Sequence, residues 1–306
     1  MISNLNASGE AFLANMTRVQ RRMEEATRQA SSGLRVNTAS DAPDQVDAIL
    51  QLRTDAVRNT QIGNNLSLAK TDADAADSAL SSAAKLLDRA RTLGAQGANF
   101  TLDAAGRQSL AGEVQALQEQ MVAISRTSVQ GRYIFAGDDE NTPPYQLDPT
   151  TATGVARMTT APATRRLEDP AGGTFAVSKT AGEIFDARNP DDTPASNNVF
   201  AALNSLRVAL LNNDTTAITA AVGSIQNAGD QLGFSQGFYG SVLGRLADAT
   251  NYDQSYDVQL KTQLSQKVDA DVTEAAMTLT QTTTQLQAAF QMQAKMPHTS
   301  LFDFLG

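Results

Sequence analysis

Apolar side chains near both ends of the chain recur at alternating steps of four and three residues, and this rhythm constrains the fold more than any other feature. The N-terminal set is Phe12, Met16, Val19, Met23, Ala26 and Ala30, and the C-terminal set is Val272, Ala275, Leu279, Thr282, Leu286, Ala289, Gln293 and Met296. Such positions share one stripe of an α-helix, as in helices that pack against another helix. The rhythm therefore predicts an assembly seam at each end of the chain.

Helix signals continue through the N-terminal half. Ser8 is a candidate N-cap for a first helix, and Gly33 can stop that helix. Residues 31–43 form a bent connector, and Pro43 occupies a favoured position in the first turn of a second helix. We expect this second helix to run to about residue 95 and a third helix to end at Gly131. The second helix keeps the four–three rhythm in one stripe, which consists of Leu66, Ala69, Ala73, Ala76, Leu80, Ala83, Leu87 and Ala90.

The C-terminal half returns to the same rhythm. Helix is expected to resume near Asn198, and Asp214 can cap the helix after it. Residues 233–240 combine glycine with phenylalanine and tyrosine, which predicts a flexible joint. The last helix is expected to run without interruption from Ser241 to Met296.

The middle of the chain has a different composition. Seven of the nine prolines lie between Pro143 and Pro194. The stretch GRYIFAG at residues 131–137 favours a strand with Tyr133 and Phe135 on one face and Ile134 on the other, so that one face can pack inward while the other meets a neighbouring subunit. Short alternating segments between glycines suggest small strands beyond it, so we expect a compact β-rich module.

These signals predict a mainly α fold, an elongated helical bundle or coiled-coil rod formed by the N- and C-terminal arms, with a small inserted β-rich module. The expected segments are an N-terminal assembly helix and turn at 1–42, an outgoing helical arm at 43–137, the inserted module at 138–197, a return arm at 198–260, and a C-terminal assembly helix with an apolar tail at 261–306.

The composition argues against several classes of function. The net charge of −9 disfavours nucleic-acid binding, which needs a basic stripe. The chain has no cysteine and one histidine, His298, and it has no phosphate-binding glycine motif, so we expect no enzyme activity, metal site or cofactor. It contains no apolar run of about 20 residues, so we expect no membrane insertion. The polar N-terminus predicts no cleaved signal peptide.

The tail HTSLFDFLG ends an otherwise polar segment with apolar side chains. Leu301, Phe302, Phe304 and Leu305 are candidates for an intermolecular anchor, because an exposed chain end tolerates such residues poorly unless something covers them.

Three segments resemble a known family. SSGLRVNTASDAPDQVDAILQLR at 31–53 is similar to the turn of the flagellin superfamily. Its motif positions are held by Ser32, Gly33, Arg35, Asn37, Asp41 and Pro43. GRYIFAG, with Gly131, Tyr133, Phe135 and Gly137, and the C-terminal LQAAFQMQAKMPHTSLFDFLG resemble the hook-associated protein 3 family within that superfamily.

This resemblance implies a structural role at the junction between the hook and the filament of the bacterial flagellum. Members of the family assemble as a ring on hook-associated protein 1, and flagellin polymerises on that ring. The implied partners are therefore hook-associated protein 1, flagellin, further copies of the chain and a flagellar export chaperone. The implied location is extracellular, after type III export without a cleaved signal peptide.

Two other interpretations remain open at this point. The chain could be a short filament flagellin, which GRYIFAG and the proline-rich edge after it disfavour. It could also be a surface-displayed binding module with flagellin-like arms, although residues 138–195 offer only Tyr145, Phe175 and Phe185 to stack against a sugar.

Overall fold

The computed structural model describes residues 2–168 and 173–295, and it divides the chain into two compact units. Unit 1 comprises Met1–Arg58 and Tyr256–Gly306, and unit 2 comprises Asn59–Ser255. The fold is mainly α, with long helices and three small two-stranded antiparallel sheets among the described residues, as the sequence predicted. Across the same described ranges, no helix is both long enough and apolar enough to cross a lipid bilayer.

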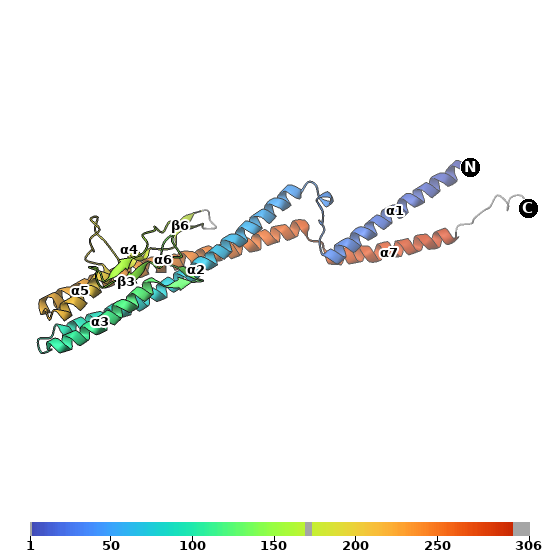
Figure 1. Cartoon of the computed structure of the whole chain (residues 1–306). Helices are drawn as coiled ribbons and strands as arrows, with labels where there is room; N and C mark the ends of the chain where they lie inside the picture. Colours follow the sequence, from blue (N-terminus) through green and yellow to red (C-terminus); the bar gives the residue numbers. More distant parts are fainter. Residues whose placement is uncertain (1, 169–172, 296–306) are drawn as a thin grey trace, which may run out of the picture. The chain divides into compact units, whose positions relative to one another are not determined.

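Unit 1 pairs the two ends of the chain. Helix α1 (Ile2–Ser32) contacts helix α7 (Val272–Lys295), and the two lie side by side (Figure 1). The short 3-10 helix η1 (Ala39–Asp41), the start of α2 and the end of α6 complete the unit. The first helix begins at Ile2, so the prediction of an N-cap at Ser8 is wrong.

A small separate core lies beside the turn that follows α1. It consists of Val36, Ala42, Ile49 and Val268. Pro43 falls before helix α2 (Val46–Gly97) and not inside its first turn, because η1 occupies the preceding residues.

Unit 2 contains the main core, which α2, α3 (Ala104–Ser125), α5 (Val199–Leu211) and α6 (Thr215–Val268) share with the inserted module. The predicted rhythm of the second helix is confirmed, since each of its stripe residues is at most 3% exposed. They are Leu66, Ala69, Ala73, Ala76, Leu80, Ala83, Leu87 and Ala90. Helices α3 and α5 pack against each other (Figure 1).

The inserted module consists of three hairpins and one short helix. Strand β1 (Ser128–Val129) pairs with β2 (Arg132–Tyr133), β3 (Tyr145–Leu147) pairs with β4 (Val155–Arg157), and β5 (Arg166–Glu168) pairs with β6 (Thr174–Ala176). Helix α4 (Ala181–Phe185) follows. These pieces share the core of unit 2 and do not form a single sheet.

The structure corrects two expectations for the segment that leads from α3 into the module. Helix α3 ends at Ser125, before the predicted Gly131, because the chain turns into β1. Strand β2 ends at Tyr133, so the expected alternation of faces through 133–135 does not occur. Phe135 is fully buried, while Tyr133 and Ile134 are half-buried.

The C-terminal arm differs from the prediction in two places. Residues 233–240 are helical and belong to α6, so the predicted joint is wrong. The helix that was expected to continue to Met296 instead ends at Val268, and α7 begins at Val272. The helical arm therefore breaks where no glycine or proline occurs.

Candidate assembly interface

The paired helices α1 and α7 bring most of the predicted seam together. Phe12, Met16, Val19 and Met23 on α1 and Leu279 and Leu286 on α7 are all half-buried. The most buried positions are the small residues Ala26 and Ala275 and the hydroxyl-bearing Thr282, each 3% exposed. Val272 is 51% exposed and does not take part in the pairing, and Met296 lies outside the described residues.

The polar side chain of Thr282 is accommodated in the seam by its own helix. Its hydroxyl donates a hydrogen bond to the Thr278 carbonyl at 2.7 Å and reaches the Leu279 carbonyl at 3.1 Å. A buried hydroxyl that is bonded in this way does not incur the cost of an unmade hydrogen bond. The seam can therefore close without an apolar side chain at this position.

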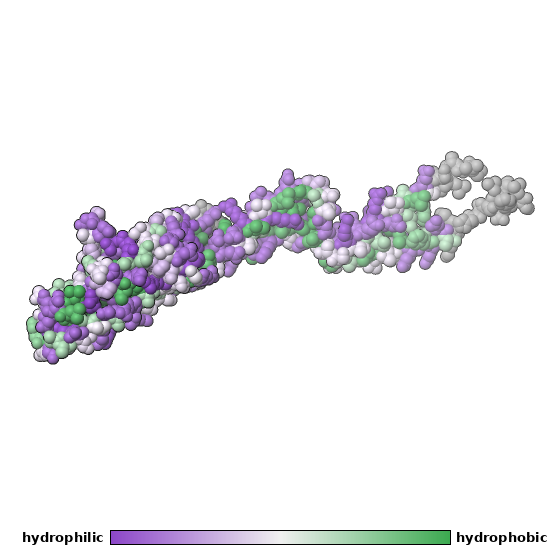
Figure 2. Space-filling view, viewed as in Figure 1, coloured by the Kyte–Doolittle hydropathy of each residue, from purple (hydrophilic) through white to green (hydrophobic). Residues whose placement is uncertain are grey.

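Several large apolar side chains of the same two helices point away from the seam. Leu13, Met277 and Met292 are each more than 60% exposed, and Phe290 is 51% exposed. Figure 2 shows apolar colour reaching the surface among polar residues on these helices. Apolar side chains at the surface are typical of contact sites where they form a contiguous patch.

The motif after α1 folds into a closed turn. Gly33 ends the helix with a φ of +71°, a left-handed conformation that glycine adopts without strain. Asp41 Oδ2 accepts hydrogen bonds from the backbone N–H groups of Asn37 and Thr38 at 2.9 and 2.8 Å. These donors, Thr38 first, lower the pKa of Asp41. Asn37 Nδ2 donates to Ser32 Oγ, so one motif residue positions another.

Arg35 connects this turn to the end of α6. Its Nη2 donates to the carbonyl of Lys267 at 2.9 Å and to that of Gln266 at 3.5 Å. Its backbone N–H donates to the Val268 carbonyl at 2.7 Å, and the N–H of Ala270 donates to the Gly33 carbonyl at 2.9 Å. We call residues 33–41 together with residues 266–270 the clasp.

The second motif, GRYIFAG, anchors the inserted module inside unit 2. Gln130 and Gly131 have positive φ angles of 51° and 80°, which suits the two-residue turn between β1 and β2. Gly137 also has a positive φ, and a Cβ there would collide with the backbone of residues 161–162. Phe135 packs edge-on against Phe185 at 5.8 Å between ring centroids. Phe135 is therefore a core residue, whereas the neighbouring Tyr133 and Ile134 are half-buried.

Charged side chains fasten the module to α2. Arg132 contacts Asp72 at 3.2 Å and Glu140 at 3.0 Å, and Arg165 contacts Asp72 at 3.4 Å. The hydrogen bond to Glu140 raises the pKa of Arg132 despite partial burial. The four charges alternate in sign, which favours a fixed position of the hairpin on the helix.

Asp186 is the polar centre of the module. Its fully buried carboxylate accepts hydrogen bonds from the Tyr145 hydroxyl, the guanidinium groups of Arg157 and Arg188, and Asn198 Nδ2. Burial and then the neighbouring Asp186 carboxylate raise the pKa of Tyr145. Sequence analysis did not single out this carboxylate, and no spacing signal marks it, because Tyr145, Arg157 and Asn198 lie 12 or more residues away in the sequence.

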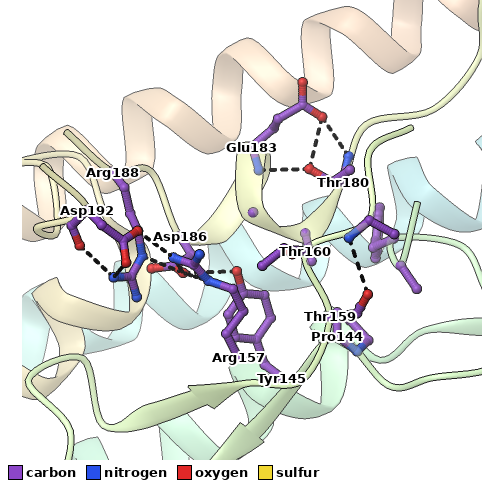
Figure 3. A pocket seen from close by; sticks show the side chains of 15 residues that line it. Pro144, Tyr145, Arg157, Thr159, Thr160, Thr180, Glu183, Asp186, Arg188 and Asp192 are labelled. Carbon is purple, nitrogen blue, oxygen red and sulfur yellow. Dashed lines mark hydrogen bonds and ion pairs between the residues drawn. The ribbon is translucent and has the colours of Figure 1, made fainter. Parts of the chain in front are cut away.

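A cavity of about 280 Å³ lies beside this cluster (Figure 3). Its charged groups are already engaged: Arg157 with Asp186 and Asp192, and Glu183 with the Thr180 hydroxyl and backbone. Within residues 2–168 and 173–295, no group of three or more His, Cys, Asp or Glu side chains is arranged to hold a metal ion. The ion pairs and hydrogen bonds of Asp186 link strand β4, the end of α4 and the residues that follow it.

The remaining predicted site lies beyond the described residues. The tail residues Leu301, Phe302, Phe304 and Leu305, together with His298, fall outside residues 2–168 and 173–295. The tail anchor therefore stays a prediction.

Comparison with known sequences supports the resemblance noted in the motifs. A family model described as the bacterial flagellin N-terminal helical region matches residues 2–140. Flagellar hook-associated protein 3 of Escherichia coli K12 is 24% identical over 291 residues, which cover 90% of each chain. The protein of the same name from Salmonella typhimurium LT2 is 23% identical over 310 residues, which cover 96% of each chain.

The fold also has solved counterparts. The flagellar junction protein of Legionella pneumophila superposes with a TM-score of 0.56 at 15% identity, covering 71% of this chain and 98% of that one. The similarity thus extends from the sequence motifs to the arrangement of the helices, and it covers most of the chain.

Proposed function

We propose that this chain, a flagellin-like structural component of the bacterial flagellum, joins the hook to the filament. In this role a ring of copies assembles on hook-associated protein 1 and presents a surface on which flagellin polymerises. The similarity to hook-associated protein 3 over nine tenths or more of the chain supports this assignment. The Legionella pneumophila protein with a similar fold is described as a flagellar junction protein, which agrees with this assignment.

The observation that carries the proposal is the helix pair α1–α7 with apolar side chains on its outer surface. Leu13, Met277 and Met292 remain exposed although the seam between the helices is closed. Exposed apolar side chains do not stabilise an isolated subunit. In an assembly they can be buried against neighbouring subunits, which is favourable. We therefore assign the terminal segments 1–42 and 261–306 to assembly. We assign the inserted module to the contacts that are particular to this subunit.

The proposal extends to the route by which the chain reaches its place. We infer extracellular location on the flagellum, delivery through the flagellar type III apparatus without a cleaved signal peptide, and an export chaperone that holds the chain beforehand. These partners follow from the resemblance of the motifs at 31–53 and 131–137.

Immuno-electron microscopy of flagella that carry a tagged copy tests the assignment. We expect label at a single position between hook and filament, and a deletion strain should complete its hooks and lose flagellin to the medium. Label distributed along the whole filament would contradict the junction role and favour the filament-flagellin interpretation. Long filaments grown from the purified protein alone would contradict it equally.

A substitution in the seam tests the assembly role separately. Leu279→Asp places a charge at a half-buried position of the α1–α7 pair and should abolish incorporation into flagella, because an unpaired buried charge is costly. Leu211→Asp makes the same change at an exposed leucine of α5, outside the segments assigned to assembly, and is the matched control that should incorporate normally. Normal incorporation of both variants would show that the seam is not needed for assembly.

A further inference from the structure

The break between α6 and α7 contains no helix-breaking residue. Residues 267–274 read KVDADVTE and contain neither glycine nor proline. Helix α6 nevertheless ends at Val268 and α7 starts at Val272. Asp271 and Glu274 favour a helix start at this point, but nothing in the segment forbids a continuous helix, so contacts elsewhere in unit 1 also contribute to the break.

The clasp supplies those contacts. The last four carbonyls of a helix have no partner within the helix. Here the Ser265 carbonyl accepts from the N–H of Asp269, and the other three depend on the N-terminal arm. The Arg35 guanidinium bonds the carbonyls of Gln266 and Lys267, and the backbone N–H groups of Arg35 and Val36 bond that of Val268.

These three carbonyls are the ones that a continuous helix would use. In an uninterrupted α-helix the amide of each residue bonds the carbonyl four residues earlier. The amides of Ala270, Asp271 and Val272 would then bond the carbonyls of residues 266, 267 and 268. In the clasp, Arg35 and Val36 hold these acceptors, and the Ala270 N–H is directed to the Gly33 carbonyl. The two arrangements therefore compete for the same atoms.

In the broken form, the start of α7 is also capped. Asp271 Oδ1 accepts hydrogen bonds from the N–H groups of Thr273 and Glu274 at 2.8 and 3.1 Å, which caps the start of α7. The broken form thus satisfies the carbonyls of residues 266–268 and the amides of Thr273 and Glu274, and a continuous helix would satisfy the same carbonyls from within. Such an element has two discrete states whose balance a single contact can set.

We propose that Arg35 is a switch residue: while it holds the end of α6, α6 and α7 are two helices, and when it lets go they fuse into one helix through residues 269–271. Fusion also withdraws the Ala270 N–H from Gly33, so it releases the turn at 33–41 from the C-terminal arm. The direction in which α7 leaves α6 would change with it, and so would the pairing of α7 with α1. This inference concerns the chain alone and does not depend on its proposed place in the flagellum.

Amide hydrogen exchange of the full-length protein, followed residue by residue by NMR, tests the switch. In the broken form, Asp271 and Val272 precede the first bonded turn of α7, so their amides should exchange quickly. In Arg35→Ala, fusion should slow the exchange of both amides about tenfold or more, with helical Cα chemical shifts at Ala270 and Asp271, since each amide gains an intrahelical bond. Arg53→Ala removes another exposed arginine of unit 1 and should change neither quantity.

A second variant separates fusion from simple fraying. Proline is favoured at the first position of a helix and excluded from its interior, so Val272→Pro is compatible with the broken form and incompatible with the continuous one. Val272 is 51% exposed, which leaves the packing intact. The double variant Arg35→Ala/Val272→Pro should return Asp271 to the fast exchange of the wild type. Unchanged or faster exchange at Asp271 in Arg35→Ala would overturn the proposal, as would slow exchange that persists in the double variant.

Discussion

Asp186 has no exposed side-chain surface, and four side chains donate hydrogen bonds to it. Replacing it with alanine removes one acceptor from each of two guanidinium groups and the acceptor of a buried tyrosine hydroxyl. We expect Asp186→Ala to lower the free energy of unfolding by about 3–5 kcal/mol. Asp74→Ala, which removes an exposed pair with Lys70, should cost no more than about 0.5 kcal/mol. Urea denaturation measures both, and equal losses would show that Asp186 does not organise the module.

At the residue scale, burial could be predicted where residues follow a periodic spacing, and it was missed where the contacts have no such spacing. Ala26, Ala275 and Thr282 follow the seam rhythm and are buried as that rhythm requires. Asp186 could not be found in this way, because its partners are brought to it by tertiary structure. Phe135 was noticed for its motif, but its burial depends on Phe185 and Tyr239, which no local pattern connects to it.

At the element scale, helix α6 contains several glycines on an exposed face. Gly233, Gly237, Gly240 and Gly244 follow one another at steps of four and three, and a Cβ at each would meet nothing within 4 Å. Gly237→Ala should therefore stabilise unit 2 by about 0.5–1 kcal/mol, since alanine loses less backbone entropy in a helix. Gly97→Ala is the opposing control, because its Cβ would collide with the Leu210 side chain. Thermal melts that show no gain for Gly237→Ala would contradict this account.

The same glycines explain why the predicted joint at 233–240 was wrong. Each glycine in a helix interior costs about 1 kcal/mol relative to alanine, which favours a break when local sequence alone is considered. Burial of Leu232, Tyr239, Val242 and Leu246 on the opposite face offsets that cost. The break after Val268 was missed for the converse reason: it depends on Arg35, more than 230 residues away in the sequence.

At the scale of the whole molecule, the two units differ in how much core holds them. Unit 2 contains the main core, whereas unit 1 has a small cluster and a seam of mostly half-buried residues. Short helices with thin seams are marginal in water. Limited proteolysis of the free protein should therefore trim roughly 30–45 residues from each end and leave unit 2 intact, as mass spectrometry of the fragments would show. Equal protease resistance of residues 12–30 and of α2 would contradict this expectation.

The contrast between the ends and the middle was predictable from pattern, because proline content and helical rhythm change sharply near residue 138. The arrangement of the module was not predictable. Its three hairpins are two or three residues long in each strand, and their registers are set by packing on the helices and by the Asp72 ion pairs. Short strands of this kind leave almost no periodic signal.

The clasp also determines the order in which the chain can fold. The Arg35–Lys267 contact closes a loop of 232 residues, and in unit 2 the Asn59 side chain reaches the Asp253 carbonyl across 194 residues. Once that inner contact exists, 38 residues of the outer loop remain to be closed, which lowers the entropic cost of closure by about 1.6 kcal/mol. Helices α1 and α7 should thus be the last elements to pair, whichever end of the chain is made first.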